Sequence, residues 1–411
     1  MKILFLCQYY PPESNAPAVR TSEMSERWAR EGHDATVLTA FPHHPTGIIP
    51  PEYSGRFFLR EERNGVHVVR TYVYVTPNKG VIRRSLSYAS WMFSAIVLGA
   101  LRVGRPDVIV ATSPQFLCAV AGFVLSRIKR VMFVMEVRDL WPESIVAVGA
   151  LRDGSLVVRL LRRIERLLYR KADHIVVVSP GFLPYMRGVG VPEGKLSLLP
   201  NGVDLTLFTP EPGGEDPYAA NGVRQPFRIL YTGTVGLAHA LEIVIEAAEK
   251  LRGSDVAFVV VGEGACRAEL VEDVKRRSLD NVYFLTMQPR RTMPAWIHGA
   301  NAVLVHLRPS RLFETVLPSK LFEYMGCARP VLMGVAGAAA EIVTEAGCGW
   351  LFAPGNVEAL LGVVDEIRRD PDEAARRGRR GRKFAEQHYD RDRLASRYTS
   401  EILVPLFERE I

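Results

Sequence analysis

The regular alternation of short apolar runs with amphipathic helical patterns constrains this fold more than any other feature of the sequence. Runs such as KILFLCQ, VHVVRTYVYV and VMFVMEV in the first half are separated by patterns typical of helices. The second half repeats this order, with runs such as FRILYTG and NAVLVHL. Continuous stretches of Val, Ile and Leu indicate parallel strands that are covered on both faces of a sheet. The sequence therefore predicts an α/β protein with two doubly wound, Rossmann-like domains.

A stretch without periodicity, TPEPGGEDPYAANGVRQP at 209–226, marks the predicted boundary between the two domains. It is rich in Gly and Pro, which is typical of a linker. A chain of 411 residues is also too long for one ordinary core. We therefore predict a first domain over 1–208, a linker over 209–226, a second domain over 227–388 and a terminal helical segment over 389–411.

Charge is distributed unevenly between the two halves. Residues 1–205 contain 26 Lys and Arg against 17 Asp and Glu, whereas residues 206–411 contain 26 against 28. A basic half indicates nucleic acid, a membrane surface or an anionic substrate as partner. The five cysteines are scattered without the spacing of a metal site, which is typical of a reducing compartment. The N-terminal MKILFLCQYY is interpreted as a strand rather than a signal peptide, so we expect a cytoplasmic protein.

Two segments of the first half combine apolar residues with arginines. Residues 85–103 form an apolar stretch near the lower length limit of a membrane span, and RLLRRIERLLYRK covers 159–171. Both are typical of basic amphipathic helices that lie on anionic lipid. Ordinary core helices with a solvated basic face explain the same pattern equally well.

Residues directly after the apolar runs are candidates for ligand binding, because ligands of doubly wound sheets bind beyond the carboxyl ends of the strands. The turn YTGTVGLAHALE contains Gly233 and Gly236, which let the backbone approach a phosphate. VVVGEGACRAEL begins like a dinucleotide fingerprint, but Arg267 replaces its third glycine. Glu263 and Arg267 are therefore either ligands of a nucleotide or surface residues.

The strongest candidate for a binding motif is RPSRLFETVLPSKLFEYMGCARP at 308–330. Ser319 is a predicted helix N-cap, and Lys320 and Glu323 are three residues apart, hence on one helical face. A cation and free N–H groups at a helix start suit a diphosphate, and a carboxylate one turn later suits ribose hydroxyls. The alternative is a surface ion pair between Lys320 and Glu323, which stabilises a helix by only about 0.2–0.5 kcal/mol.

Arg138 and Asp139 form a second candidate pair, in MEVRDLWPES at 135–144. They follow directly after an apolar run, where charged residues are more often functional than on the flank of a helix. The alternative is a structural salt bridge that closes the turn.

Several motifs, spread over nearly the whole chain, resemble those of glycosyltransferase family 4, the retaining enzymes of the GT-B fold. QYYPPESNAPAVRTSEMSERWAREGHDATVLT resembles the family's opening strand, loop and helix, and LSLLPNGVDLTLFTP matches its Pro-Asn-Gly-Val-Asp-x-x-x-Phe signature. VVVGEGACRAEL, NVYFLTMQP and LPSKLFEYMGCARPVL follow in the family's order. DLWPES together with PSKLFEYM resembles a bacterial subgroup that includes O-antigen and capsule N-acetyl-L-fucosamine transferases. The resemblance implies two domains that face an interdomain cleft, with the segment 389–411 crossing back onto the first domain.

The same resemblance implies a donor site on the second domain. Glu323 matches the second Glu of the family's E-x7-E motif, the one that binds ribose. Thr315 stands at the first Glu of that motif, and Glu314 is one position early. Thr234 and His239 stand where the family has the Arg and Lys that bind the donor phosphates.

Lys320 and Arg308 are the nearest substitutes for these missing cations. The predicted donor contacts are Gly233, Thr234, Glu263, Arg267, Met287, Arg308, Glu314, Ser319, Lys320, Leu321 and Glu323. Arg138 stands at the His of the family's catalytic region, so Arg138 and Asp139 are the predicted catalytic residues. The predicted contacts on the sugar and acceptor side are Asn15, Arg20 and His43.

The activity that the resemblance implies is retaining hexosyl transfer from a UDP-sugar to a polyprenyl-pyrophosphate-linked saccharide during synthesis of a bacterial surface polysaccharide. An N-acetylated deoxyhexose is the candidate sugar. Cations and helix N–H groups would stabilise the leaving UDP, so no metal ion or other cofactor is expected. The basic first domain would lie on the anionic cytoplasmic face of the inner membrane. The alternatives are a UDP-sugar epimerase of the same architecture and a nucleic-acid-binding protein, which is disfavoured because the basic residues flank apolar helices.

Overall fold

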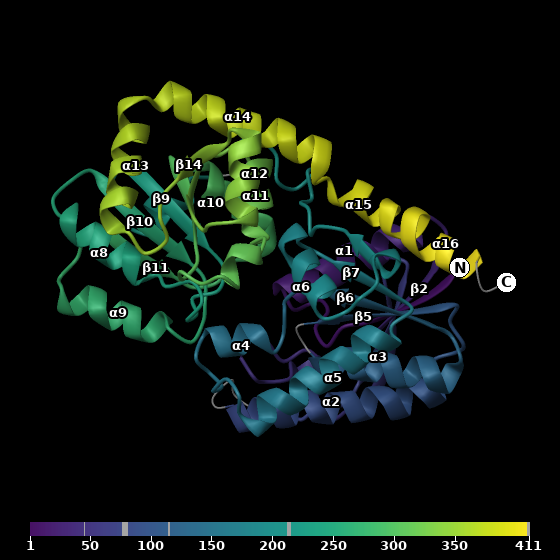
Figure 1. The fold of residues 1–411 in the computed structure, drawn as a ribbon. Helices are drawn as coiled ribbons and strands as arrows, with labels where there is room; N and C mark the ends of the chain where they lie inside the picture. Colours follow the sequence, from purple (N-terminus) through teal and green to yellow (C-terminus); the bar gives the residue numbers. More distant parts are fainter. Residues whose placement is uncertain (45, 76–80, 114–115, 212–214, 409–411) are drawn as a thin grey trace. The chain divides into compact units, whose positions relative to one another are not determined.

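A computed structural model describes residues 1–44, 46–75, 81–113, 116–211 and 215–408 of the chain. The chain divides into two units, one formed by Met1–Asn201 with Arg391–Ile411 and the other by Gly202–Asp390. It therefore leaves the first unit after Asn201 and returns to it at Arg391. Each unit is built around a sheet of its own (Figure 1).

The first unit contains an eight-stranded sheet in the order β3-β4-β2-β1-β5-β6-β7-β8. Neighbouring strands are parallel, except that β3 pairs antiparallel with β4. The tight turn of this hairpin has φ of 51° at Asn64 and 78° at Gly65, and Asn and Gly adopt positive φ most readily. The strands are β1 Lys2–Leu6, β2 Asp34–Ala40, β3 Phe58–Arg63, β4 Val66–Thr71, β5 Val108–Ser113, β6 Met132–Val137, β7 His174–Val177 and β8 Leu196–Leu198.

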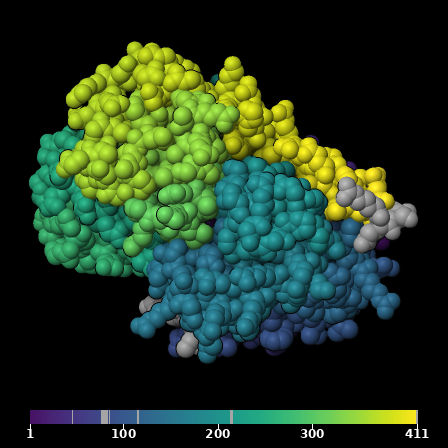
Figure 2. All heavy atoms as spheres, in the orientation of Figure 1, coloured from purple at the N-terminus to yellow at the C-terminus, as the bar shows by residue number. Residues whose placement is uncertain are grey.

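Helices cover both faces of this sheet. On one face α1 packs with the terminal α15, and Trp28 Nε1 donates to Ala395 O while its ring packs against Tyr398. Figure 1 shows α2, α3 and α5 on the other side of the sheet, and the outer side of α5 is exposed at the surface in Figure 2. The helices are α1 Ala16–Arg30, α2 Val81–Arg102, α3 Phe116–Lys129, α4 Glu143–Ala147, α5 Leu156–Lys171, α6 Leu183–Gly188, α15 Arg391–Arg397 and α16 Val404–Glu408, with a π-helical turn at Tyr398–Leu403.

The second unit contains a six-stranded sheet in the order β11-β10-β9-β12-β13-β14, in which all neighbours are parallel. Its strands are β9 Phe227–Thr232, β10 Val256–Val261, β11 Val282–Leu285, β12 Ala302–His306, β13 Val331–Gly334 and β14 Gly349–Leu351. Its helices are α7 Pro217–Ala220, α8 Glu242–Lys250, α9 Arg267–Arg276, α10 Met293–His298, α11 Lys320–Gly326, α12 Ala338–Ala346, α13 Val357–Arg369 and α14 Pro371–His388. Val, Ile and Leu of β9, β10 and β12 form the core together with α8 and α13.

Two doubly wound parallel sheets are thus present, which confirms the fold class predicted from the apolar runs. The run VHVVRTYVYV, predicted as one strand, ends its ladder at Thr71. Beyond this point α2 supplies the partners of the backbone, because Ser94 Oγ donates to Tyr72 O and the Tyr74 N–H donates to Ser90 Oγ. Side chains of a neighbouring helix therefore end the strand that the apolar pattern would continue.

The predicted linker 209–226 lies within the second unit where it is described. Tyr218 of α7 is fully buried there, and its hydroxyl donates to Trp296 O at 2.6 Å. Residues 212–214 of this segment and 409–411 of the terminal segment lie outside the described residues. Across the parts that are described, no helix combines the length and the apolar character needed to cross a membrane.

Candidate functional site

In the second unit, the turn after β9 and the first residue of α11 meet around the ammonium group of Lys320. Gly233 follows β9 with φ of 108°, and a Cβ at this position would lie 3.5 Å from Lys320 Nζ. The same Nζ lies 3.5 Å from the centroid of the Tyr231 ring, in a cation–π contact. A Cβ at Gly262, which follows β10, would overlap Gly233 O at 1.8 Å, so the two turns pack directly on each other.

Lys320 Nζ is buried and has no hydrogen-bond partner among the described residues. Burial lowers the pKa of Lys320 well below its usual value, and the carboxylate of Glu323 opposes this shift only in part. The same burial, together with the charge of Lys320, lowers the pKa of His239 to about 3, so its imidazole is neutral. An unpaired buried ammonium is costly, and an anion bound beside Gly233 would remove this cost.

Glu323 lies one turn further along α11 and is already engaged by a cation. Its Oε1 accepts a hydrogen bond from Arg290 Nη1 at 2.9 Å, and both side chains are about one-fifth exposed. The guanidinium of Arg290 also covers the ring of Phe208. The alternative of a Lys320–Glu323 ion pair is not found among the ion pairs of the described residues. The i,i+3 spacing thus places Lys320 and Glu323 on one side of the helix, but Arg290 from the loop after β11, not Lys320, binds the carboxylate.

Ser319 does not cap α11 with its side chain, contrary to the prediction. It stands at the N-cap position but has helical backbone angles, and its side chain makes no capping bond. The reason is that the first turn closes earlier: the Leu321 N–H donates to Pro318 O, and the Phe322 N–H donates to Ser319 O. The side chain of Leu321, also a predicted contact, is fully buried in the core.

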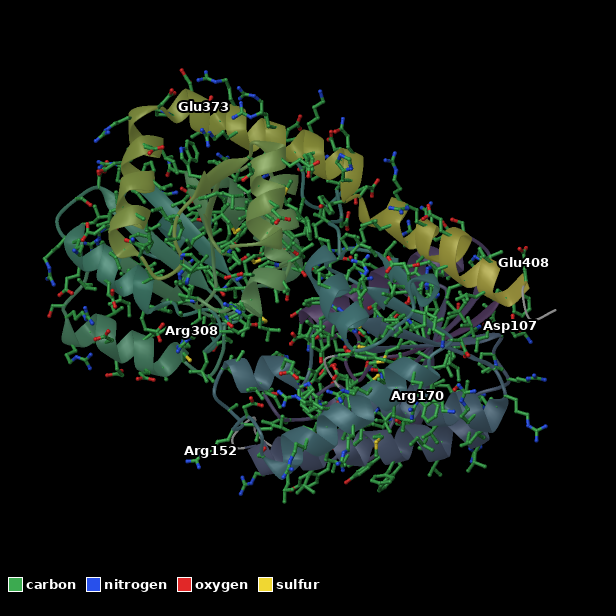
Figure 3. The ribbon with its side chains drawn as sticks, viewed as in Figure 1. Asp107, Arg152, Arg170, Arg308, Glu373 and Glu408 are labelled. Carbon is green, nitrogen blue, oxygen red and sulfur yellow. The ribbon has the colours of Figure 1, made fainter. Side chains whose placement is uncertain are left out.

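Arg308 and Thr234 stand at the rim of the Lys320 site. Arg308 follows β12, the neighbour of β9, and its N–H and Nε donate to Ala238 O and Leu237 O in the turn after β9. Its side chain is exposed (Figure 3). Thr234 is exposed as well, and its carbonyl accepts a hydrogen bond from the Tyr231 hydroxyl at 2.7 Å. The strand order therefore brings an exposed guanidinium to the turn that lacks a cation of its own.

The loops after β10 and β11 flank the same edge of the sheet. Arg267 Nη2 donates to Phe284 O at 3.0 Å, and its Nε lies 3.8 Å from Glu263 Oε1. The Val235 N–H donates to Glu263 O, which ties the loop after β10 to the turn after β9. Met287 is half-buried in the loop after β11. Glu263 and Arg267 thus have structural partners within this edge of the sheet.

Glu314 is placed differently from the other predicted donor contacts. It is exposed on a 3-10 turn, Phe313–Thr315, and its backbone abuts Gly337 at the start of α12. A Cβ at Gly337 would lie 2.2 Å from Glu314 O, so this contact requires glycine. Glu314 is therefore held by its backbone, and its carboxylate is exposed.

In the first unit, the predicted site residues Arg20 and Arg138 both lie beside the carboxylate of Glu136 in β6. Arg20 of α1 donates to both oxygens of Glu136 at 3.0 and 2.9 Å and to Pro200 O at 3.2 Å, and it is 3% exposed. This placement makes Arg20 a residue that positions Glu136, not an exposed ligand contact. Arg138 Nε lies 4.0 Å from Glu136, and its Nη2 donates to Ala16 O. Burial lowers the pKa of Arg138 to about 10, so it stays charged at neutral pH.

Asp139 and Asn15 follow β6 and β1 on the same edge of this sheet. Burial raises the pKa of Asp139 to about 6, although hydrogen bonds with Ser144 and Leu140 oppose the shift. Asn15 caps α1, because its Oδ1 accepts from the Ala18 N–H at 3.0 Å.

His43 lies beside a buried carboxylate that sequence reasoning missed. Glu13 accepts hydrogen bonds from the N–H groups of His43, His44 and Tyr10, and burial raises its pKa to about 7. His43 Nδ1 lies 2.8 Å from Phe41 O, and burial lowers the pKa of its ring. The loop after β1 carries no pattern that would reveal the role of Glu13. Glu136, by contrast, stands out as one charge inside the apolar run VMFVMEV.

Acidic residues and histidines do not gather into a metal site in the described parts of the chain, where no group of three or more His, Cys, Asp or Glu side chains could hold an ion. Two Asp-x-Asp triplets occur in the sequence, and both have structural uses. Asp370 caps α14, and Asp392 accepts hydrogen bonds from Arg27 and Arg30 of α1. Metal-independent transfer stays a prediction.

Comparison with known proteins adds independent findings. Residues 15–202 match the model of the glycosyl transferase 4-like domain, and residues 219–384 match that of the glycosyl transferases group 1. The putative colanic acid biosynthesis glycosyl transferase WcaI of Escherichia coli is 27% identical, over 98% of this chain and 100% of its own. These matches do not favour the epimerase alternative.

Two solved structures share the fold over nearly the whole length. Sucrose-phosphate synthase from Thermosynechococcus elongatus has a TM-score of 0.79 at 18% identity, covering 99% of both chains. Anabaena HepE in complex with UDP and glucose has a TM-score of 0.71 at 19% identity, covering 98% of this chain and 99% of its own. Residues 15–202 and 219–384 thus carry a glycosyl transferase 4-like domain and a glycosyl transferases group 1 domain on two Rossmann-like sheets, and the chain is a glycosyltransferase with the GT-B fold.

Proposed function

We propose that this glycosyltransferase moves a hexosyl group from a UDP-sugar to a lipid-linked saccharide, with retention of configuration at the transferred carbon. The observation that carries the donor assignment is the buried, unbonded ammonium of Lys320 beside Gly233. A diphosphate at this point would accept hydrogen bonds from Lys320 and meet the backbone of a glycine turn. The complex of Anabaena HepE with UDP and glucose supports the choice of UDP.

The remaining donor contacts follow from the positions of the loops. Arg308 would bind the outer side of the diphosphate, because its guanidinium is exposed beside the turn after β9. Glu323 would accept hydrogen bonds from the ribose while the hydrogen bond from Arg290 holds its side chain in place. The loops 262–267 and 285–290 would hold the uracil. This assignment leaves Glu314 to contacts with the sugar, and it gives no direct role to Leu321, whose side chain is buried in the core.

In the transfer, the bond between the sugar carbon and the UDP oxygen breaks, and its electron pair goes to the leaving phosphate. The acceptor hydroxyl forms the new bond on the same face of the sugar and passes its proton to that phosphate. Lys320 and Arg308 stabilise the negative charge that develops there, so we expect the reaction to need no metal ion. Arg138, charged and only partly hydrogen-bonded, and Asp139 are assigned to the sugar and acceptor side.

The acceptor and the pathway rest on similarity. The name of WcaI places that relative in colanic acid biosynthesis, which supports a role for this chain in a bacterial surface polysaccharide. We propose a polyprenyl-pyrophosphate-linked saccharide as acceptor and an N-acetylated deoxyhexose as the first sugar to test. Cytoplasmic synthesis at the inner membrane is part of the same proposal.

A panel of nucleotides and nucleotide sugars, tested for protection against thermal unfolding, examines the donor assignment directly. UDP at about 100 times its dissociation constant stabilises the folded protein by about 2.7 kcal/mol, whereas GDP and dTDP at equal concentration should have little effect. Stabilisation by GDP alone, or by none of the nucleotides, would contradict the proposal. With the stabilising UDP-sugar and a polyprenyl-pyrophosphate saccharide, transfer releases free UDP; release of an isomerised sugar nucleotide would instead indicate an epimerase.

A further inference from the structure

We propose that the outer side of α2, α3 and α5 is a docking surface for an anionic lipid bilayer. This surface, called the basic apolar face below, is independent of the donor site and of the sugar that is transferred. Its exposed apolar members are Leu86, Phe93, Val97 and Leu101 of α2, Ile128 of α3, and Leu156, Val157, Leu160 and Leu167 of α5. Its exposed basic members include Arg83 and Arg102 of α2, Arg127 and Arg130 at α3, and Arg159, Arg163, Arg166 and Arg170 of α5.

The apolar residues of this face form stripes, not scattered single exposures. On α2, Phe93, Val97 and Leu101 follow each other at four-residue intervals and are 63%, 55% and 74% exposed. The opposite side of the same helix buries Trp91 and Ala95 completely. Of the fifteen large exposed hydrophobic side chains in the described chain, nine belong to these three helices. Such a concentration marks an interaction surface, because soluble surfaces expose large apolar side chains mostly one at a time.

The charge that α2, α3 and α5 carry on this face is basic, although Arg162 of α5 is paired with Glu143 and Asp153, which precede the helix. The sequences of α2 and α3 contain no Asp or Glu, and α5 contains one, Glu165. Glu165 is buried and accepts hydrogen bonds from the hydroxyls of Tyr169 and Tyr185, so it does not reach the outer side. Figure 3 shows Arg152 just before α5 and Arg170 near its end. Arginines without neighbouring carboxylates are suited to the phosphates of anionic lipids.

Helix α14 in the second unit shows what a basic helix looks like without this function. Arg376, Arg377 and Arg380 of α14 all donate to the carboxylate of Glu373, which Figure 3 labels. No large hydrophobic side chain of α14, which lies wholly within the described residues, is among the exposed ones. Helix α14 thus pairs three of its arginines within the helix and exposes no large apolar side chain, whereas Arg159, Arg163 and Arg166 of α5 lie on a helix with exposed leucines.

A bilayer fits these features better than a nucleic acid or a protein partner. Leu, Val and Phe side chains gain free energy at the boundary between headgroups and acyl chains while arginines contact the phosphates. Nucleic acids would offer aliphatic side chains no comparable apolar layer. The helices α2 and α5 would lie in the plane of the surface, spanning about 33 and 24 Å at 1.5 Å per residue. Helix α3 packs between them, so the three form one layer.

The test is co-sedimentation of the full chain with vesicles of phosphatidylcholine alone or with about one-third phosphatidylglycerol. We expect binding to the anionic vesicles only, weakened by raising NaCl from about 0.1 to about 0.5 M. The pair Arg163→Gln and Arg166→Gln should weaken binding roughly tenfold or more, since each basic residue at the surface contributes about a factor of five. The pair Leu156→Ser and Leu160→Ser should weaken it by a similar factor, and this loss should persist at high salt.

Matched controls come from the second unit. Arg379→Gln with Lys383→Gln removes two exposed charges of α14, and Leu351→Ser removes an exposed leucine of β14. All variants should show the far-ultraviolet circular dichroism and melting temperature of the wild type, and the controls should bind vesicles within about twofold of it. Equal binding to neutral vesicles, no binding, or equal losses in the controls would overturn the proposal. Two other results would also overturn it, both in the case that the wild type binds no vesicles. In one, the wild type binds duplex DNA and the α5 variants do not; in the other, the wild type is a dimer in gel filtration and the α5 variants are not.

Discussion

The substitution Lys320→Met tests the donor site most sharply, because it changes the stability of the free protein and the affinity for the donor in opposite directions. In the free protein, Lys320 Nζ is buried against the Tyr231 ring without a hydrogen-bond partner in the described chain. Methionine has a similar length and is apolar, so it can fill the same space beside Gly233 without a charge. The variant therefore removes a cost from the free state and an attraction from the bound state.

The gain in the free state is at most the cost of an unsatisfied buried group, about 1–3 kcal/mol, and losing the cation–π contact with Tyr231 reduces it. It also depends on pH. Because burial lowers the folded-state pKa of Lys320, the unfolded chain binds more protons between that pKa and about 10.5. The free energy of unfolding of the wild type therefore rises as pH increases through this window, and the variant should lack this rise.

The loss in the bound state follows from the hydrogen bond that Lys320 would donate to a phosphate. Bonds to charged groups contribute about 1.5–3 kcal/mol, so the dissociation constant for UDP should increase about 10- to 150-fold. At a UDP concentration of about 100 times the wild-type dissociation constant, the wild type gains about 2.7 kcal/mol. A variant weakened about 100-fold would gain only about 0.4 kcal/mol under the same conditions.

Scanning calorimetry with and without UDP, together with calorimetric titration, measures both effects. The matched control is Lys250→Met, which removes a half-exposed lysine from α8 of the same unit. This control should bind UDP like the wild type and should not melt at a higher temperature. Unchanged UDP affinity in Lys320→Met would refute the assignment of Lys320 to the diphosphate. A lower melting temperature of the free variant would show that the ammonium is satisfied in solution, contrary to the structure.

Three further predictions concern the carboxylates. Glu323→Ala should weaken UDP affinity about tenfold or more in a calorimetric titration, whereas Glu314→Ala should change it less than about twofold; the reverse order would mean that the motif is assigned in the wrong register. Burial raises the pKa of Asp139 to about 6, so the free energy of unfolding of the wild type falls as pH rises from about 4 to 6. Denaturant titrations should show that Asp139→Asn lacks this fall and is more stable than the wild type at pH 7.5 by about 2–3 kcal/mol. Glu136→Gln should lower the free energy of unfolding by about 3–5 kcal/mol, because the charge of Arg20 stays buried without its partner; chemical denaturation measures this, and a loss below about 1 kcal/mol would speak against the buried pair.

Secondary structure was predictable where a segment carries its own pattern. Four or more consecutive apolar residues mark β1, β5, β6 and β10, because a strand buried on both faces excludes most polar side chains. The three-residue strands β8 and β14 have no such length and could not be recognised. The end of β4 could not be predicted either, since side chains of α2 far along the chain decide it.

The donor edge shows the same division. Gly233 and Lys320 could be named from the sequence, because a glycine turn after a strand and a cation at a helix start are local features. The partner of Glu323 could not, because Arg290 is 33 residues away and reaches it only through the order of the strands. The absence of a side-chain capping bond from Ser319 could not be predicted either, because the Leu321 N–H already donates to Pro318 O.

By itself, the sequence determined the two doubly wound sheets, the edge of each sheet at which ligands are expected, and the residue types available there. Only the tertiary structure decided which charges are paired. It joins Glu136 to Arg20 across 116 residues, and it leaves Lys320 buried without a partner among the described residues. The physical reason is that periodicity reflects neighbours a few residues apart, whereas burial and pairing depend on segments that meet only when the chain folds. Whether a charged side chain serves stability or binds a ligand is therefore set at that second level.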